Sequence, residues 1–500
     1  MKSAGPPRSC RRAARCGARG RRALRTSLVR GPHNFPGIHP SRIVTTPMSK
    51  DLMISVAGVR GIVGESLTPA VVARFAAAFA RSLPGDGPVV LGRDARVTGP
   101  MVRLAACAGL NAAGRDVVDL GLATTPTTQL AVEHLHAAGG VILTASHNPA
   151  PWNALKFLSA RGEFLGPQAG AEVKDRYEND RDLWASWDRV GAVREESNAL
   201  EWHLDRVLTL PHVNVDAIRK RKLHVVVDGC ASVGGVALPA LLKRLDAHVT
   251  KLDCEPNGHF TRELEPLPDH LGALGKAVRE AGADLGIAAD PDADRAAFVD
   301  AAGVPLGEEY TVALGTRVAL ATQKGPVVTN LSTSRMLETV CEKVGVPLHR
   351  TPVGEAHVVE AMHARRAVAG GEGNGGMILP AAHHGRDALV AMALVAQAMS
   401  PGTTLRELAD SLPRYVMIKD KLARPQEPWE GAAERLRRAF AGWGLESSDG
   451  LRFARGEAWV HVPPSGTEPV VRVIAESPEA GETRAIVDQA RRALDAASGR

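Results

Sequence analysis

The sequence predicts an α/β protein in which three similar α/β domains with mixed, mostly parallel sheets are followed by a smaller C-terminal α+β domain. Short β-branched segments alternate with helix-like segments from residue 51 onward, a pattern typical of parallel sheets covered by helices. Three successive blocks of about 110–150 residues repeat this alternation, which indicates a repeated α/β unit. A chain of 500 residues also exceeds one ordinary core.

Apolar or β-branched runs supply the expected strands, and segments with helical apolar spacing supply the helices. The strands are expected at 89–91, 116–120, 141–143, 224–227, 249–252, 285–288, 327–330 and 347–350. The helices are expected at 101–113, 127–134, 236–245, 270–281, 334–344 and 356–362. Near the C-terminus, strands are expected at 413–422, 459–462 and 470–476 and helices at 429–443 and 482–494. We expect a basic, disordered extension over 1–50 and domains over 51–195, 196–303, 304–411 and 412–500.

The positive charge of the chain is concentrated in its first fifty residues. The formal net charge is +6, yet residues 1–50 hold 12 Lys and Arg and no acidic residue. The remaining 450 residues carry 49 basic and 55 acidic side chains, which excludes an extended nucleic-acid surface there. No apolar run reaches the ~18 residues of a membrane span. The six cysteines form no C-x-x-C pair, a pattern that favours a reducing cytoplasm over a disulfide framework.

The basic segment from Met1 to Pro47 is open to three interpretations. An Arg-rich, acid-free stretch is typical of a mitochondrial targeting peptide, although its Gly and Pro residues disfavour an amphipathic helix. The same composition fits a nucleic-acid-binding arm. The third interpretation is that translation starts at Met48, directly before the strand-like residues 52–56. Each interpretation predicts a segment without a fold of its own.

The first candidate functional loop, Thr144-Ala145-Ser146-His147-Asn148-Pro149, follows an apolar strand. Loops at the carboxyl ends of parallel strands are where ligands bind. Ser146, flanked by polar residues, therefore fits a nucleophile or a phosphate acceptor. A plain turn is the alternative, because Asn-Pro and Ser-His-Asn form turns readily.

The second loop, Asp290-Pro291-Asp292-Ala293-Asp294-Arg295, contains three alternating carboxylates. Alternate residues of an extended segment share one side, so these carboxylates converge. They repel one another unless a cation neutralises them, and an oxygen-binding ion such as Mg²⁺ fits best. An EF-hand is excluded, since its sixth position would be Arg295 and its twelfth Ala301. A solvated acidic turn is the remaining alternative.

The third loop, residues 370–376, reads GGEGNGG. It satisfies the G-x-G-x-x-G pattern of dinucleotide-binding loops. That kind of loop requires a helix directly afterwards, whereas strand-like residues follow here, so we reject a dinucleotide-binding site. Five glycines suit a backbone that approaches a polar ligand, with Glu372 and Asn374 available for sugar hydroxyls. A flexible turn is the alternative.

The fourth loop, Pro464 to Pro469, precedes a strand that carries Arg472. The hydroxyls of Ser465 and Thr467, the backbone around Gly466 and a nearby guanidinium would bind a non-reacting phosphate. A hairpin turn is the alternative. A Walker A loop does not occur in the sequence.

These four loops, in this order, resemble those of the α-D-phosphohexomutase superfamily, and the resemblance extends from about residue 54 to residue 494. Residues 58–61 and 92–96 resemble the opening motifs of that family. Asn153 and Lys156 fit the segment after its serine loop, and residues 351–354 fit its third-domain hinge loop. The resemblance implies four domains around a central cleft, with one motif in each domain.

The resemblance also implies a reaction. Ser146 would carry a phosphate, and Asp290, Asp292 and Asp294, together with an oxygen of that phosphate, would hold one Mg²⁺ per chain. The phosphoserine would exchange phosphoryl groups with a hexose monophosphate through a hexose 1,6-bisphosphate, which also acts as activator. Phosphate would thereby move between C6 and C1 of the sugar.

In the same scheme Arg60 and Arg295 would neutralise the transferred phosphate, because phosphoryl transfer depends on alignment and charge neutralisation. Lys156 would exchange the proton of the sugar hydroxyl. Many relatives have histidines at the positions of Glu355 and Gly376. Their absence here favours Lys156 and His147 as the residues for acid–base chemistry.

Two further departures from the family pattern affect ligand binding. Asn374 replaces a common serine of the Gly-rich loop. Pro463 stands where the phosphate loop usually begins with arginine, which leaves phosphate binding to Arg472, the loop hydroxyls and the backbone.

The Gly-rich loop and residues 383–387, which read HHGRD, resemble the phosphoglucosamine mutase-like branch. We therefore expect a cytoplasmic phosphoglucosamine mutase whose partner is a small sugar phosphate, with neither nucleic acid nor membrane as a partner. Phosphomannomutase/phosphoglucomutase activity is the alternative. A non-catalytic sugar-phosphate-binding relative is disfavoured by the intact Ser146, the three aspartates and Arg295. No oligomeric state follows from the sequence.

Overall fold

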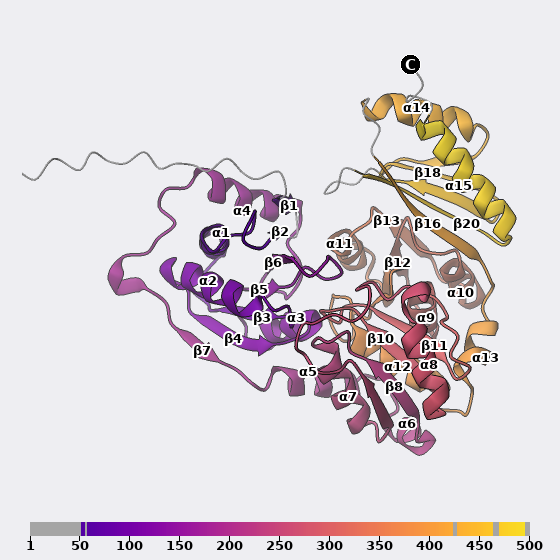
Figure 1. Cartoon of the computed structure of the whole chain (residues 1–500), viewed down its shortest axis with the longest axis horizontal. Helices are drawn as coiled ribbons and strands as arrows, with labels where there is room; N and C mark the ends of the chain where they lie inside the picture. Colours follow the sequence, from indigo (N-terminus) through magenta and orange to yellow (C-terminus); the bar gives the residue numbers. More distant parts are fainter. Residues whose placement is uncertain (1–51, 56–57, 424–427, 464–469, 496–500) are drawn as a thin grey trace, which may run out of the picture. The chain divides into compact units, whose positions relative to one another are not determined.

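The computed structural model describes residues 52–55, 58–423, 428–463 and 470–495. Within these residues four separate sheets follow one another along the chain, coloured in sequence order in Figure 1. The expected extension over 1–50 and the predicted phosphate-loop residues Ser465, Gly466 and Thr467 lie outside the described residues. No helix of the described ranges has the length and apolar character that crossing a membrane requires.

The first sheet has seven strands in the order β1-β2-β6-β5-β3-β4-β7. These are β1 Met53–Ser55, β2 Gly58–Ile62, β3 Val89–Arg93, β4 Val117–Leu122, β5 Gly139–Leu143, β6 Trp152–Leu158 and β7 Val193–Glu195. The accompanying helices are α1 Pro69–Ser82, α2 Gly99–Ala112, α3 Thr125–His134, α4 Pro167–Asn179 and the 3-10 turn η1 Trp187–Arg189. Strand β3 is parallel to β4 and β5, whereas β6 is antiparallel to β5.

Alternate residues of β3 point to opposite faces of this sheet, and both faces are buried. Val89 and Leu91 belong to the core formed with α1 and α2, while Val90 belongs to the core formed with α3. Apolar residues on both faces are what a sheet covered on both sides requires. Helix α1 begins where the Thr68 side chain accepts a hydrogen bond from the Val71 N–H and Pro69 occupies the first turn.

Helices α5 Ala199–Leu208 and α6 Val215–Arg221 lead into the second sheet, which has the order β11-β10-β8-β9. Its elements are β8 His224–Asp228, α7 Gly234–Arg244, β9 His248–Leu252, η2 Pro268–His270, α8 Gly272–Ala281, β10 Leu285–Ala289 and β11 Ala296–Asp300. The third sheet has the order β13-β12-β14-β15. Its elements are α9 Glu309–Thr322, β12 Val327–Asn330, α10 Met336–Val344, β13 Leu348–Thr351, α11 Glu355–Arg365, β14 Ala369–Glu372, β15 Gly376–Ile378, α12 Ala388–Met399 and α13 Leu405–Asp410.

The three sheets contain the same four-strand unit, which confirms the predicted three similar domains. In each unit the first strand lies between the second and third, and all three are parallel. The fourth strand returns antiparallel beside the third. The turn from third to fourth strand therefore occupies the same place in each unit. These three turns contain Ser146, residues 290–295 and residues 373–375.

Helix α12 joins the second and third units through one apolar core. Every residue from 388 to 396 is buried, so nearly the whole circumference of the helix is covered. It contacts α7 and α9, and the core cluster around it extends into both units. A helix that is apolar on all sides is stable only when it is buried on all sides. Packing of α12 therefore holds these two domains together.

The C-terminal sheet is antiparallel throughout, in the order β16-β20-β19-β18-β17. Its elements are β16 Val416–Ala423, α14 Trp429–Ala439, β17 Gly444–Glu446, β18 Leu451–Arg455, β19 Ala458–Val462, β20 Val470–Ser477 and α15 Ala480–Asp495. Helices α14 and α15 pack together over it (Figure 1). The helix expected over 429–443 ends at Ala439, because Gly442 has a φ of 83° and the chain turns into β17.

Candidate active site

Ser146 lies in the turn between β5 and β6 with a backbone φ of 47°. A positive φ is uncommon for residues other than glycine, so the surrounding contacts must hold it. Arg96, whose side chain is buried, donates to the carbonyl oxygens of Ser146 and Asn148 at 2.6 Å. It also donates to those of Pro149 and Trp152 at 2.9 Å. One buried guanidinium therefore fixes the turn that presents Ser146.

Two further side chains support the same turn. The carboxylate of Asp94 accepts hydrogen bonds from Thr144 Oγ1 at 2.6 Å and from Arg96 Nε at 3.2 Å. The Ser146 N–H in turn donates to Thr144 Oγ1 at 2.9 Å. Residues 92–96 thus act on the serine loop by positioning it.

Asp290, Asp292 and Asp294 are fully buried in the turn between β10 and β11. One carboxylate oxygen from each lies within 4.8 Å of the other two. Among the described atoms, Asp292 Oδ1 and Asp294 Oδ1 have no hydrogen-bond partner. Buried carboxylate oxygens without partners are costly unless a cation neutralises them, and an all-oxygen donor set suits Mg²⁺. The residues present therefore fit a magnesium ion.

The three carboxylates are not equivalent. Burial raises the pKa of Asp290 well above its ordinary value, and the negative charges of Asp294 and Asp292 raise it further. Burial acts in the same direction on Asp292, but Lys156 and Thr125 outweigh it and lower its pKa. Lys156 Nζ and Thr125 Oγ1 each donate to Asp292 Oδ2 at 2.7 Å.

Ser146 and the aspartate loop meet directly. Ser146 Oγ donates to Asp290 Oδ2 at 2.9 Å, although 144 residues separate them in the sequence. His147 Nδ1 lies 3.5 Å from the same hydroxyl oxygen. The predicted phosphate acceptor and the predicted metal ligands therefore share one site.

Positive charge gathers around this hydroxyl. Burial and then the guanidinium groups of Arg295, Arg60 and Arg472 lower the pKa of His147 well below its usual range, so its ring is neutral near pH 7. Arg60 Nη1 donates to Asn148 Oδ1 at 3.1 Å. This concentration of positive charge suits an anionic ligand such as a phosphate group.

Arg295 lies at the end of the aspartate loop and is buried. Its Nη1 lies 3.2 Å from Glu265 Oε1, and its Nε lies 3.7 Å from Asp294 Oδ1. The Arg295 N–H donates to Asp290 Oδ1 at 3.2 Å. The predicted phosphate-neutralising residue thus also stabilises the turn that carries the three carboxylates.

Arg386, for which the sequence predicts no role, connects this loop to the Gly-rich loop. It is buried before α12, with Nη2 2.5 Å from Asp294 Oδ2 and Nη1 2.6 Å from Glu372 Oε2. Its Nε lies 2.9 Å from Glu355 Oε2. The HHGRD segment was the available signal for this residue, but only the contacts reveal three carboxylates around one guanidinium.

The predicted sugar-binding residues are held by protein groups. Glu372 Oε1 accepts hydrogen bonds from Asn330 Nδ2 at 2.8 Å and from the Gly354 N–H at 2.9 Å. In the orientation that matches donors with acceptors, the Asn374 amide contacts the Glu372 carbonyl and Arg386 Nη1, both at 3.3 Å. Glu372 and Asn374 therefore form one hydrogen-bonded group with Arg386.

Close packing accounts for glycines in this loop. A Cβ on Gly373 would lie 2.0 Å from Glu309 Oε2, and one on Gly376 would lie 2.2 Å from Arg386 Cδ. Lys419 of β16 reaches the same loop, with Nζ 3.2 Å from the Gly373 carbonyl and 2.9 Å from Glu309 Oε1. Lys419 thus connects the C-terminal domain to the Gly-rich loop.

The structure brings most of the predicted site residues together. Ser146, His147 and Lys156 meet the three aspartates, and Arg295 lies on the same loop. Glu372 and Asn374 connect to the aspartates through Arg386, and Arg472 acts electrostatically on His147. Residues that sequence reasoning missed are Thr125, Glu265 and Arg386.

A serine on a constrained turn, an all-carboxylate cation site and clustered guanidinium groups are typical of an α/β enzyme that handles phosphate groups. Models of the phosphoglucomutase/phosphomannomutase α/β/α domains I, II and III match residues 52–183, 201–303 and 307–415. The model of the C-terminal domain matches residues 417–493. The chain belongs to this family of phosphohexomutases, which are enzymes of the intramolecular phosphotransferase type within the isomerases.

Individual relatives agree with this assignment. The chain is 35% identical to a phosphoglucomutase/phosphomannomutase of Thermococcus kodakarensis, over 84% of this chain and 93% of the relative. It is 36% identical to a "Probable phosphoglucosamine mutase" of Methanopyrus kandleri, over 87% of this chain and 95% of the relative. A phosphoglucomutase/phosphomannomutase family protein of Burkholderia thailandensis shares the fold, with a TM-score of 0.78 at 24% identity over 89% of this chain and 98% of that chain.

Enzymes of this family generally use Mg²⁺, and the three aspartates of this chain are a group that is able to bind a metal.

Proposed function

We propose that Ser146 carries a phosphoryl group and exchanges it with a hexose monophosphate through a hexose 1,6-bisphosphate, which also acts as activator. The observation that carries the proposal is the 2.9 Å contact between Ser146 Oγ and Asp290 Oδ2. The contact brings the Ser146 hydroxyl of the TASHNP loop to the edge of the cluster formed by Asp290, Asp292 and Asp294. A serine there would receive or release a phosphoryl group next to the Mg²⁺ that the three carboxylates would hold.

Mg²⁺ bound by Asp290, Asp292 and Asp294, with an oxygen of the phosphate on Ser146, would neutralise charge on the transferring group. Arg60 and Arg295 would bind phosphate oxygens from the protein side.

Proton exchange divides between two residues in this proposal. His147 is neutral, so its ring is able to accept the proton of an attacking sugar hydroxyl. Lys156, ion-paired to Asp292, is able to donate a proton to the leaving oxygen. Glu372 and Asn374 would bind sugar hydroxyls, while Arg472, with Ser465, Gly466 and Thr467 of the loop before it, would hold the phosphate that does not react.

Phosphopeptide mapping tests the serine. The full chain is incubated with glucose 1,6-bisphosphate and Mg²⁺, digested and analysed by mass spectrometry, together with Ser146→Ala. Ser82→Ala is the matched control, because Ser82 ends α1 and its hydroxyl donates only to the Phe79 carbonyl. We expect phosphate on the Ser146 peptide, and loss of turnover by orders of magnitude in Ser146→Ala alone. Full activity with phosphate elsewhere, or with none, contradicts the assignment.

We propose glucosamine phosphate as the preferred substrate, supported by the HHGRD segment and by the name of the relative from Methanopyrus kandleri. Phosphomannomutase/phosphoglucomutase activity is the second candidate, favoured by the relative from Thermococcus kodakarensis. Glucose, mannose and glucosamine differ at C2, and a site that hydrogen-bonds a substituent discriminates strongly.

The two candidates are separated by kcat/KM for glucosamine, glucose and mannose phosphates, each supplied with its matching bisphosphate. A preference for mannose or glucose above ~100-fold, about 2.7 kcal/mol of transition-state binding, establishes the second candidate. No turnover of any sugar phosphate, with Ser146 unphosphorylated, indicates a binding protein on the same scaffold. We also propose a cytoplasmic location, which fractionation against compartment markers tests.

A further inference from the structure

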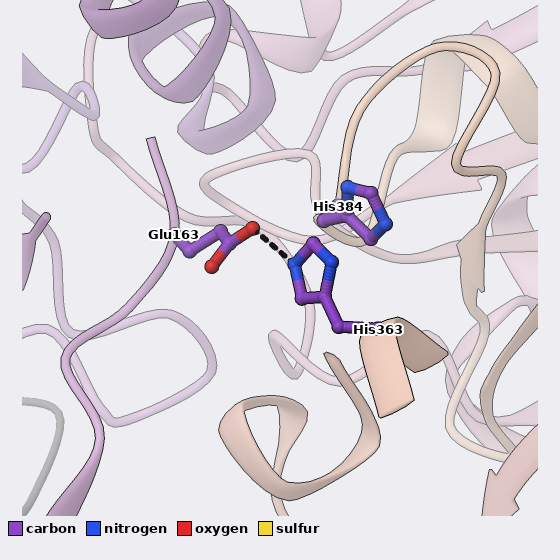
Figure 2. Close-up of side chains that lie close together, drawn as sticks. All are labelled: Glu163, His363 and His384. Atoms are coloured by element: carbon purple, nitrogen blue, oxygen red, sulfur yellow. Dashed lines mark hydrogen bonds and ion pairs between the residues drawn. The ribbon is translucent and has the colours of Figure 1, made fainter. Parts of the chain in front are cut away.

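A second group of metal-ligating side chains lies apart from Ser146 and the three aspartates. Figure 2 shows the Glu163 carboxylate pointing at the His363 ring, with the His384 ring beside it. Glu163 follows β6, His363 lies in the last turn of α11 and His384 precedes α12. One ligand atom from each lies within 4.8 Å of the others. Within the described part of the chain, only this group and the aspartate triplet gather three such ligands.

The present contacts bring ligand atoms of the three side chains within reach of one ion. Glu163 Oε1 lies 2.6 Å from His363 Nε2, and the rings of His363 and His384 stack with centroids 4.0 Å apart. Tetrahedral Zn²⁺, with bonds of about 2.0–2.2 Å, holds its ligand atoms about 3.4 Å apart. For all three to bind one ion, side-chain rotations would open the Glu163–His363 contact and turn the two stacked rings so that a nitrogen of each faces the ion.

The surroundings support Glu163 as a ligand. Its carboxylate is buried, and Arg161 Nη2 lies 2.7 Å from Oε2. This ion pair engages Oε2 and leaves Oε1 directed at His363. Metal ligands are commonly oriented by such outer contacts.

His363 and His384 are also suited to binding a metal ion. His363 has 39% of its side chain exposed, which gives an ion a route in. The ring nitrogens of His384 make no hydrogen bond within the described residues. The neutral imidazole ring is the form of histidine that binds metals.

We propose that Glu163 Oε1 and ring nitrogens of His363 and His384 bind one Zn²⁺, at a site separate from the three aspartates. Two imidazoles and one carboxylate match the ligand preference of zinc, whereas Mg²⁺ prefers oxygen ligands alone. A water molecule would occupy the fourth position. The ion would tie the segment after β6 to α11 and to the segment before α12, two parts of the chain about 200 residues apart.

Metal titration of the full chain tests the site. The chain is stripped with chelator, saturated with Mg²⁺ to fill the oxygen site, and titrated with Zn²⁺ by calorimetry and with Co²⁺ by absorption. We expect one additional ion per chain, with the visible bands of tetrahedral Co²⁺ and without a thiolate charge-transfer band. Glu163→Gln, His363→Ala and His384→Ala should each weaken Zn²⁺ binding at least ~10-fold. His363 is partly exposed, so its replacement leaves the core intact.

Two controls separate this site from others. His248→Ala removes one ring of another close histidine pair, whose centroids lie 4.1 Å apart, and should leave Zn²⁺ binding unchanged. Asp292→Asn should impair Mg²⁺ binding but retain the additional Zn²⁺. Binding of Zn²⁺ that is equal in wild type and all three ligand variants, or absent in Mg²⁺-saturated wild type, overturns the proposal. The Glu163–His363 contact is then an ordinary hydrogen bond. Neither outcome depends on turnover or on phosphate at Ser146.

Discussion

Lys156 Nζ lies 2.7 Å from Asp292 Oδ2, an ion pair between β6 of the first sheet and the loop after β10 of the second. The Asp292 carboxylate is fully buried, so the ammonium group supplies the main opposing charge in the described structure. Because the pair joins the serine-bearing domain to the aspartate loop, it links the two halves of the candidate site.

Lys156→Met should lower kcat by about 10²–10⁴ if Lys156 exchanges a proton with the substrate. Mg²⁺ binding should persist near neutral pH, because all three carboxylates remain. Without the lysine the pKa of Asp292 rises, so acidification should release Mg²⁺ at a higher pH than in wild type. Steady-state kinetics and Mg²⁺ titration across pH measure both effects. Lys174→Met is the control, since Lys174 pairs only with Glu178 on the surface of α4. Unchanged kcat in Lys156→Met removes the lysine from proton exchange.

Asp292→Asn should weaken Mg²⁺ binding and turnover together, because one of three charges that neutralise the ion is lost. Asp228→Asn is a buried control at the end of β8, where the carboxylate pairs with Arg262 at 2.7 Å. That variant should lose stability but keep its Mg²⁺ affinity. Calorimetric Mg²⁺ titration and activity after chelator treatment measure the difference. Full activity of chelator-treated wild type would show that the aspartates serve another purpose.

Arg386→Gln should destabilise the chain by about 3–5 kcal/mol, because Asp294, Glu355 and Glu372 would lose a buried counter-charge. Arg244→Gln removes a guanidinium that pairs with Glu201 and Asp205 near the surface, and should cost about 0.2–1 kcal/mol. Urea denaturation of the Mg²⁺-free proteins gives the comparison. Losses of equal size would mean that the buried cluster rearranges without Arg386.

Glu355→Gln should change how stability depends on pH. Burial raises the pKa of Glu355 to about 7, with Arg386 opposing the shift, whereas in the unfolded chain this carboxyl has its ordinary pKa of 4.5. The folded state therefore holds the extra proton between these values, so Glu355 reduces stability as pH rises from about 4.5 to about 7. The Tm of Glu355→Gln relative to wild type should increase over this interval and level off above it.

Glu309, whose pKa burial also raises to about 7, contributes a slope of the same sign in both proteins. For that reason the difference between the two Tm curves, rather than either curve alone, reports on Glu355. A constant difference from pH 4.5 to pH 8 would show that Glu355 titrates as an exposed carboxylate does.

The sequence by itself determined the repeated α/β architecture and the loops that carry Ser146, the three aspartates and Glu372. These signals are local, because strand and helix periodicity and turn residues act over a few neighbours. The same locality explains why the helix predicted over 429–443 is too long, since α14 ends at Ala439. Phe440 and Trp443 continue the apolar spacing of α14 and pack on its core, yet they do so from a turn.

Only the tertiary structure decided which distant groups meet. Thr125 reaches Asp292 across 167 residues, and Arg386 reaches Asp294 across 92. The sequence shows that these side chains are polar, but it does not show their partners. The partners are determined by contacts between domains and by the turn between the third and fourth strands of each repeated unit. Burial then determines their charge states, because a carboxylate removed from water keeps its charge only where a cation is close.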